Sequence, residues 1–278
     1  MKLAKLPVAY QLYSARREAD KDLEKVLSTL SELGYDGVEF AGFYGHDAKE
    51  INELLKKYNL KAISSHVGLD LIRADMFGVI AFHQAIGCEY IAVPYLPAEI
   101  RPGNPGFAEV LSLIHTFGRL CNEAGITLLY HNHDFEFVQF SGMYALDFLY
   151  TAVPENILKT EIDVCWVKYA GVDPAAYLTK YAGRCPVVHL KDFVGRREKD
   201  GPDPYALLGQ DENRENKTQS FEFRPFGYGC QNVQEVLEAA ENAGAKWLII
   251  EQDESVGRCP LEAAKMSIDT LKKAGIKD

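Results

Sequence analysis

Short apolar segments alternate with longer amphipathic segments along the chain. In the longer segments the apolar residues recur at the spacing of an α-helix, as at Leu23, Val26, Leu27 and Leu30. The short segments are rich in apolar residues, which is typical of buried β-strands. The predicted strands cover residues 8–12, 37–40, 61–65, 90–93, 126–129, 158–164, 186–190 and 247–250.

Capping residues support the helices that are predicted between these strands. Gly34 follows the first helix, as a glycine just past a helix C-terminus should. Asp47, with Glu50 three residues later, predicts a capping box at the start of the second helix. The third helix is predicted over residues 71–86, and the fourth is predicted to open at Asn104, where a proline follows.

Strand and helix alternate eight times, so the sequence predicts an α/β protein with parallel strands and helical crossovers. Eight such units in 278 residues favour a closed (β/α)8 TIM barrel over an open doubly wound sheet. No G-x-G-x-x-G motif follows a predicted strand, which argues against a dinucleotide-binding fold. We expect a single domain over residues 1–278.

A long polar stretch at about residues 194–229, after the seventh predicted strand, interrupts this alternation. Loops of such length in compact domains are usually functional or disordered. The stretch is either a lid or substrate-specificity loop, or a solvated excursion or oligomer contact. Gly227 and Gly229, just before the next helix, either present backbone amides to an anion or form a tight entry turn.

The charge of the chain limits its partners. Its 40 acidic and 30 basic residues give a net charge of −10, and an acidic surface repels nucleic acid and anionic lipid. No apolar run approaches the roughly 20 residues of a membrane span, and the N-terminal residues lack the pattern of a signal peptide. The six cysteines are scattered without a C-x-x-C pair, as expected of reduced thiols. We expect a cytoplasmic protein that binds neither nucleic acid nor membranes; whether it forms a homo-oligomer is left open.

Polar side chains concentrate where the predicted strands end. In a (β/α)8 barrel the active site is built at the C-terminal ends of the strands. A single polar strand end is most often a hydrogen-bonded structural group, but here five strand ends carry such residues. Carboxylates and imidazoles without a thiolate pair suit a divalent cation such as Mn²⁺, Mg²⁺, Co²⁺ or Zn²⁺. The strand-end residues are His66, His131, His133, Glu136, Asp163, His189, Lys191, Asp192, Glu251 and Asp253.

Five short motifs resemble those of the xylose isomerase-like TIM-barrel superfamily, which includes sugar phosphate isomerases and epimerases, inosose dehydratase and endonuclease IV. Each motif is short, but the order of all five at barrel spacing is specific for the superfamily rather than for one substrate. The motifs are GYDGVEF at 34–40, SSH at 64–66, YHNH at 130–133, HLKD at 189–192 and EQD at 251–253.

The resemblance implies one divalent metal ion, held by Glu, Asp, His and Glu from the fifth to the eighth strand. Asp163, His189 and Glu251 match three of these positions. At the fourth position, where many relatives have a glutamate, this chain has the histidine-rich YHNH motif. Glu136 is the first candidate for that ligand, and His131 is the second.

We therefore hypothesise proton abstraction next to a carbonyl of a sugar or polyol, through an enediolate that the metal stabilises as a Lewis acid. Glu251 or Glu136 would act as the base, and His131, His133 or Lys191 would be the second acid or base. Reprotonation on the other face gives epimerisation, and reprotonation at the neighbouring carbon gives isomerisation.

Four further residues are candidates for binding substrate: His66, Trp166, Arg224 and Arg258. Trp166 stands where several relatives have a histidine, so we expect it to stack on a sugar ring. With the same site, the alternative reaction is a dehydratase or lyase acting on a keto-inositol or 3-keto-glycoside. An endonuclease IV-like phosphodiesterase and a non-catalytic sugar-binding protein are the alternatives of another class. The net charge of −10 argues against the endonuclease.

Overall fold

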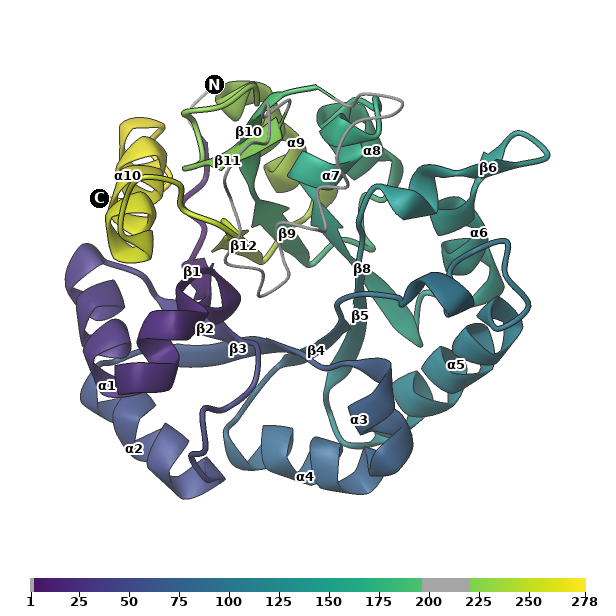
Figure 1. Cartoon of the computed structure of the whole chain (residues 1–278), viewed down its shortest axis with the longest axis horizontal. Helices are drawn as coiled ribbons and strands as arrows, with labels where there is room; N and C mark the ends of the chain where they lie inside the picture. Colours follow the sequence, from purple (N-terminus) through teal and green to yellow (C-terminus); the bar gives the residue numbers. More distant parts are fainter. Residues whose placement is uncertain (1–2, 197–220) are drawn as a thin grey trace.

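The computed structural model describes residues 3–196 and 221–278. Eight parallel strands close into a barrel in the order β1-β12-β9-β8-β5-β4-β3-β2, which confirms the predicted (β/α)8 TIM barrel (Figure 1). The barrel strands are β1 (Val8–Gln11), β2 (Gly37–Phe40), β3 (Lys61–His66), β4 (Tyr90–Val93), β5 (Thr127–His131), β8 (Leu158–Asp163), β9 (Val187–Leu190) and β12 (Trp247–Ile250).

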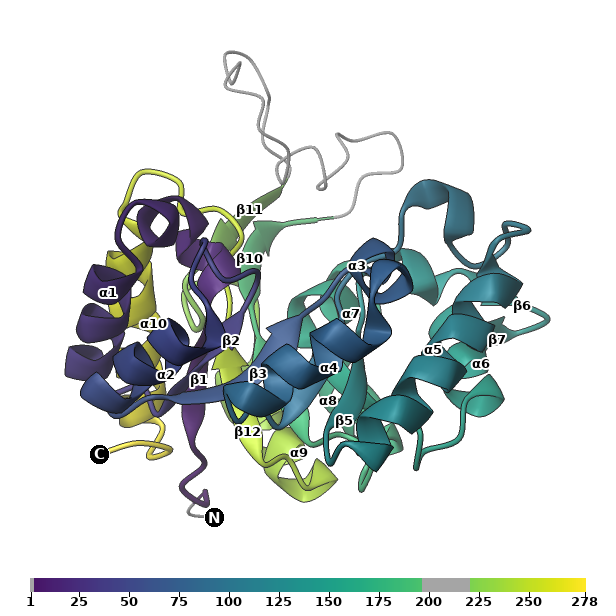
Figure 2. The ribbon, with the colours of Figure 1, turned by 90° about the horizontal axis from the view of Figure 1, so that it is seen from below.

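Helices follow the strands and surround the barrel (Figure 2). None of the described helices is long and apolar enough to cross a membrane. The α-helices are α1 (Arg16–Leu33), α2 (Ala48–Lys57), α3 (Leu69–Ala74), α4 (Met76–Ala85), α5 (Phe107–Glu123), α6 (Ala145–Ala152), α7 (Val164–Tyr169), α8 (Pro174–Lys180), α9 (Val233–Ala243) and α10 (Pro260–Lys273). Short 3-10 helices are η1 (Leu12–Ala15), η2 (Ala98–Ile100) and η3 (Phe135–Phe137).

The predicted helix caps are present. Gly34 ends α1 in the left-handed region, with φ of 95°, which glycine adopts without steric cost. At the start of α2, the Asp47 side chain accepts a hydrogen bond from the Glu50 amide, and the Glu50 side chain accepts one from the Asp47 amide. Both caps confirm the sequence prediction.

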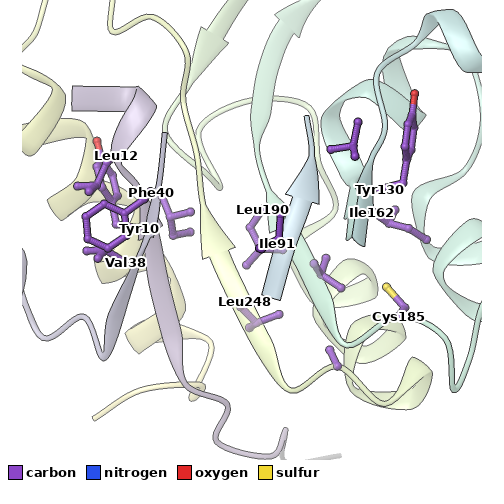
Figure 3. Packing of buried hydrophobic residues seen from close by; sticks show 14 of the residues in the cluster. Tyr10, Leu12, Val38, Phe40, Ile91, Tyr130, Ile162, Cys185, Leu190 and Leu248 are labelled. Carbon is purple, nitrogen blue, oxygen red and sulfur yellow. The ribbon is translucent and has the colours of Figure 1, made fainter. Parts of the chain in front are cut away.

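Side chains alternate between the interior and the exterior of the barrel along each strand. The interior side chains are apolar in the middle of the barrel and polar at the C-terminal ends of the strands. Outward-facing residues such as Val38, Phe40 and Ile162 pack in the large core that includes the surrounding helices (Figure 3). A separate apolar cluster fills the barrel interior and consists of Ala9, Ile63, Ala92, Leu129, Val187, Trp247 and Ile249. Two residues beyond four of these, toward the C-terminal ends, stand Gln11, His131, His189 and Glu251. The period of two therefore places this polar set above the apolar cluster.

The third predicted helix is in fact two helices, α3 and α4, that meet at Asp75. The backbone of Asp75 is extended, with φ of −158° and ψ of 84°. Its side chain accepts a hydrogen bond from the Gly78 amide at 2.8 Å, so Asp75 caps a new helix rather than continuing the first. The fourth predicted helix also begins later than expected, at Phe107, because the residues after Asn104 form a turn.

A two-stranded ribbon follows β9. Its strands, β10 (Asp192–Gly195) and β11 (Phe221–Arg224), pair antiparallel. The polar stretch predicted at 194–229 thus includes part of this ribbon, while residues 197–220 lie outside the described residues. A smaller ribbon, β6 (Gln139–Phe140) with β7 (Met143–Tyr144), precedes α6.

Candidate metal centre

Four buried side chains converge at the C-terminal end of the barrel. One ligand atom from each of His131, Asp163, His189 and Glu251 lies within 4.8 Å of the other three. His131 and Asp163 are the last residues of β5 and β8. His189 lies one residue before the end of β9, and Glu251 directly follows β12. These four strands are consecutive neighbours in the barrel. The fold therefore brings together residues as far apart in the sequence as His131 and Glu251, which are 120 positions apart.

The chemistry of this group fits a divalent cation. Two carboxylates and two imidazoles supply the oxygen and nitrogen ligands that such ions take in proteins. Asp163 Oδ1 accepts hydrogen bonds from the backbone amides of Cys165 and Trp166. Asp163 Oδ2 is buried without a hydrogen-bond partner among the described residues. A buried carboxylate oxygen without a partner is costly, and a cation at this position would remove that cost.

Lys191 supplies a positive charge beside these carboxylates. Its Nζ lies 2.7 Å from Asp253 Oδ1, 3.2 Å from Glu251 Oε2 and 3.6 Å from Asp163 Oδ2. Burial would lower the pKa of Lys191, but the three carboxylates hold it well above its ordinary value. Lys191 is therefore held in its charged form, in which it can donate a proton but cannot accept one.

The carboxylates differ in their affinity for a proton. Burial would raise the pKa of Glu251, but Lys191 and His189 hold it well below its ordinary value. Burial raises the pKa of Asp163 to about 6 and that of Asp253 to about 7, in both cases against the charge of Lys191. Glu251 is therefore ionised at neutral pH, whereas Asp253 binds and releases a proton near neutrality.

Two further glutamates, Glu39 and Glu161, lie one layer deeper in the barrel and are fully buried. His66 Nε2 lies 2.9 Å from Glu161 Oε2 and 3.2 Å from Glu39 Oε2. Gln11 Nε2 donates a hydrogen bond to Glu39 Oε2 at 2.6 Å. The deeper layer is therefore an organised polar network and not a set of solvated side chains.

The sequence prediction did not include Glu39 and Glu161 in the site, although both left a signal. Glu39 lies in the motif at 34–40, and Glu161 precedes Asp163 by two residues and so shares its face of β8. Burial would raise the pKa of Glu161, but His189 and His131 hold it well below its ordinary value. Glu161 is therefore a buried anion.

Glu136, the first candidate for the ligand from the fifth strand, lies apart from the cluster. The Tyr130 hydroxyl donates to Glu136 Oε1 at 2.6 Å, and the His133 amide donates to Glu136 Oε2 at 2.9 Å. Tyr130 alternates with His131 on β5 and belongs to the outer core, so its hydroxyl draws Glu136 away from the interior. A second group of potential ligands overlaps the cluster and consists of His66, His131, Glu161 and His189. Neither group includes Glu136, and both include His131. Among the described residues, the geometry favours His131.

A cavity of about 640 Å³ opens beside the cluster. His133 is on its wall, where its ring stacks on Phe135 with centroids 5.5 Å apart. Burial and the neighbouring His131 and Lys191 lower the pKa of His133 well below its ordinary value. The imidazole is therefore neutral and has a lone pair that can accept a proton, although the lowered pKa makes it a weaker base than an exposed histidine. The residues that line the cavity are Tyr13, Ala41, Gly42, His66, Leu71, Pro94, Tyr95, His131, His133, Lys191, Glu251 and Asp253.

Of the four predicted substrate-binding residues, only His66 is among those that line this cavity in the described part of the chain. Trp166 is fully buried in an aromatic cluster at the start of α7. Arg224 on β11 pairs with Glu222 at 3.1 Å. Arg258 lines a separate cavity of about 240 Å³. Trp166 reaches the site indirectly, because its ring lies 5.1 Å below Lys191 Nζ.

The backbone amides of Gly227 and Gly229 do bind an anion, but it is the carboxylate of Asp192. Each amide donates to Asp192 Oδ2 at 3.0 Å, and the Gln231 amide donates to Oδ1 at 3.1 Å. A Cβ atom on Gly229 would lie 2.2 Å from Asp192 Oδ1. The turn therefore serves as a tight helix entry, and its amides are already occupied by a side chain of the protein.

Solved structures of low sequence identity share this fold. A sugar phosphate isomerase/epimerase from Parabacteroides distasonis matches with a TM-score of 0.77 at 20% identity over 99% of this chain and 96% of that chain. An AP endonuclease, family 2, from Brucella melitensis matches with a TM-score of 0.69 at 15% identity over 98% and 100%. A D-allulose 3-epimerase from Methylomonas sp. matches with a TM-score of 0.69 at 11% identity over 99% and 100%. At these identities the similarity shows the fold and not the reaction.

A comparison with curated proteins found no match. The family model described as xylose isomerase-like TIM barrel matches residues 27–274. That range contains every barrel strand except β1, and it contains all four clustered residues. This match confirms the resemblance seen in the short motifs, and the chain belongs to the xylose isomerase-like TIM barrel family.

Proposed function

We propose that this protein is a divalent-metal-dependent isomerase or epimerase that acts on a sugar or polyol. The observation that carries the proposal is the convergence of two carboxylates and two imidazoles beside a cavity of about 640 Å³. When bound, the cation would act as a Lewis acid on a substrate carbonyl and would make the neighbouring C–H more acidic. The isomerase and epimerase names of two similar structures support this substrate class.

We assign the cation to His131, Asp163, His189 and Glu251. His131 replaces the glutamate that the family pattern suggests at this strand. Its imidazole faces the interior, whereas the Glu136 carboxylate is engaged by two donors on the outer side of β5. Two ionised carboxylates would balance the charge of one divalent cation, and Lys191 Nζ lies 2.7 Å from Asp253 Oδ1.

Proton transfer requires groups on the cavity wall, and His133 and Asp253 both line it. His133 follows β5 and Asp253 follows β12, with β8 and β9 between these strands in the barrel. The two groups therefore reach the cavity from different sides. His133 accepts the proton, and Asp253, with a pKa of about 7, returns a proton from the other side. This arrangement favours epimerisation, in which the proton leaves one face and returns to the other.

Solvent deuterium exchange tests the proposal even while the substrate is unidentified. The protein is loaded with Mn²⁺ and incubated in D₂O with a panel of keto-sugars, keto-inositols and 3-keto-glycosides. We expect deuterium at the carbon next to the carbonyl of at least one compound, and we expect a chelator to abolish the exchange. Exchange accompanied by loss of water or of another leaving group would identify a dehydratase or lyase instead. Metal-loaded protein that exchanges none of the panel would contradict the proposal.

A further inference from the structure

Each histidine of the proposed centre lies between an upper and a lower carboxylate. His131 Nε2 is 3.7 Å from Asp163 Oδ2, and His131 Nδ1 is 3.3 Å from Glu161 Oε2. His189 Nδ1 is 3.1 Å from Glu251 Oε2, and His189 Nε2 is 2.8 Å from Glu39 Oε2. The two rings therefore have opposite orientations. Nε2 of His131 faces Asp163, whereas Nδ1 of His189 faces Glu251.

A neutral imidazole carries one N–H and one lone pair. A cation takes the lone pair, so the other nitrogen must carry the proton and needs an acceptor. In the upper layer the carboxylates of Asp163 and Glu251 would be engaged by the cation. The acceptors that remain are the carboxylates of Glu161 and Glu39 in the deeper layer.

The deeper carboxylates are fixed in place. Gln11 donates to Glu39 Oε2, and His66 lies within 3.2 Å of one oxygen of each glutamate. Glu39 and Glu161 have no exposed surface, so water does not compete for their oxygens. Neither His131 Nδ1 nor His189 Nε2 makes a hydrogen bond among the described residues. Each nevertheless lies within 3.3 Å of a carboxylate oxygen that is held in this way, and such a carboxylate can determine which nitrogen of the imidazole carries the proton.

We propose that Glu39 and Glu161 are positioning residues that hold the proton of His189 on Nε2 and that of His131 on Nδ1. A cation would then be bound through His189 Nδ1 and His131 Nε2. This inference rests on the proposed metal centre and adds the two glutamates that orient its histidines. Neither glutamate needs to touch the cation or the substrate.

Metal affinity gives the first test. Glu39→Gln and Glu161→Gln keep the volume of each side chain but remove the charged acceptor, and each should weaken Zn²⁺ binding by roughly 10–100-fold. Asp147→Asn is the matched control, because Asp147 is also a buried carboxylate with three hydrogen-bond donors but contacts neither histidine. It should lower stability and leave Zn²⁺ affinity unchanged. Wild-type affinity in both glutamine variants would overturn the proposal.

The ring protons give the second test. In the zinc-loaded protein labelled with ¹⁵N-histidine, long-range proton–nitrogen correlations identify the protonated nitrogen of each ring, and His131→Asn and His189→Asn assign the signals. We expect the proton on Nδ1 of His131 and on Nε2 of His189.

The same protonated nitrogen in both rings would overturn the inference while leaving the metal centre intact. Binding of two zinc ions, one of them lost in Glu39→Gln, would overturn it as well, because the glutamates would then be ligands. Failure of the wild type to bind zinc would overturn both this inference and the proposed function.

Discussion

The folded structure favours the protonated form of the Glu136 carboxyl group. Its two hydrogen-bond donors, the Tyr130 hydroxyl and the His133 amide, offset only part of its lost hydration. Burial therefore raises the pKa of Glu136 from 4.5 to about 8. Between these pH values the folded chain keeps the proton and the unfolded chain releases it. The free energy of unfolding consequently falls as pH rises through this window.

Glu136→Gln should remove this contribution to the pH dependence. The quantity to compare is the free energy of unfolding of the variant minus that of the wild type. This difference should be more positive at about pH 8 than at about pH 5, by on the order of 4 kcal/mol. Urea unfolding at the two pH values measures it. Glu89→Gln, at an exposed position, should show no such change. A difference between Glu136→Gln and wild type that is the same at both pH values would contradict the assignment.

His133→Gln should lower the rate of solvent deuterium exchange by about 10²–10⁴-fold, because it removes the proposed proton acceptor. Metal occupancy should stay at the wild-type value, since His133 is not among the proposed ligands. His115→Gln, on the exposed side of α5, is the matched control and should exchange at the wild-type rate. Wild-type exchange by His133→Gln would exclude His133 as the acceptor.

At the scale of single residues, alternation along the strands predicted most of the cluster. Asp163 and His189 fall on inward positions near the ends of β8 and β9, and a period of two is enough to place them. The ligand from β5 could not be decided in the same way. Sequence spacing does not reveal that Glu136 turns back onto Tyr130, because that contact depends on the short η3 helix. Glu39 was missed because only barrel closure brings β2 close to β9.

At the scale of elements, the turn before α9 depends on one side chain. The carboxylate of Asp192 accepts hydrogen bonds from the amides of Phe193, Gly227, Gly229 and Gln231. One carboxylate thus satisfies four backbone amides in a partly buried turn, and hydrogen bonds to a charged group are stronger than those between neutral groups. It also ties the start of β10 to the segment that follows β11. This contact joins the ribbon to the turn that enters α9.

Asp192→Asn should therefore destabilise the protein, because the amide NH₂ group cannot accept the hydrogen bonds of one carboxylate oxygen. We expect the free energy of unfolding to fall by roughly 2–4 kcal/mol, as measured by urea denaturation. Asp173→Asn is the matched control, since Asp173 caps α8 and asparagine caps a helix nearly as well as aspartate. Equal stability of the two variants would contradict this role of Asp192.

Elements with local signals were predictable, and elements that depend on distant contacts were not. Strands 37–40, 90–93 and 247–250 agree with the predicted bounds because apolar runs between turn residues are a local property. The break at Asp75 also has a local cause, the cap on Gly78, but the apolar pattern continues across it and conceals it. The pairing of β10 with β11 is not local, and the polar sequence between them gave no sign of it.

At the scale of the whole molecule, closure of the barrel gathers five buried carboxylates at one end: Glu39, Glu161, Asp163, Glu251 and Asp253. Three of them, Asp163, Glu251 and Asp253, surround Lys191. Like charges at this density repel one another and oppose folding. A bound divalent cation would relieve part of that repulsion. The alternation of strands and helices predicted the barrel, but the density of charge inside it emerges only when the strand ends meet.

Metal ions should therefore stabilise the whole fold. At a concentration about 100 times the dissociation constant, a ligand that binds only the native state adds about 2.7 kcal/mol to the free energy of unfolding. The melting temperature of chelator-treated protein should rise accordingly when Mn²⁺ or Zn²⁺ is added. The same addition to Asp163→Asn should have little effect. An equal rise in both proteins would show that the stabilisation comes from another site.

The central claim is tested most directly by the metal content of the protein after equilibrium dialysis against Mn²⁺, measured by elemental analysis. We predict about one ion per chain for the wild type and for Glu136→Gln, and loss of that ion in Asp163→Asn and Glu251→Gln. Retention by Glu136→Gln would support His131 as the ligand from β5. No ion in the wild type, or unchanged occupancy in both Asp163→Asn and Glu251→Gln, would contradict the proposed centre.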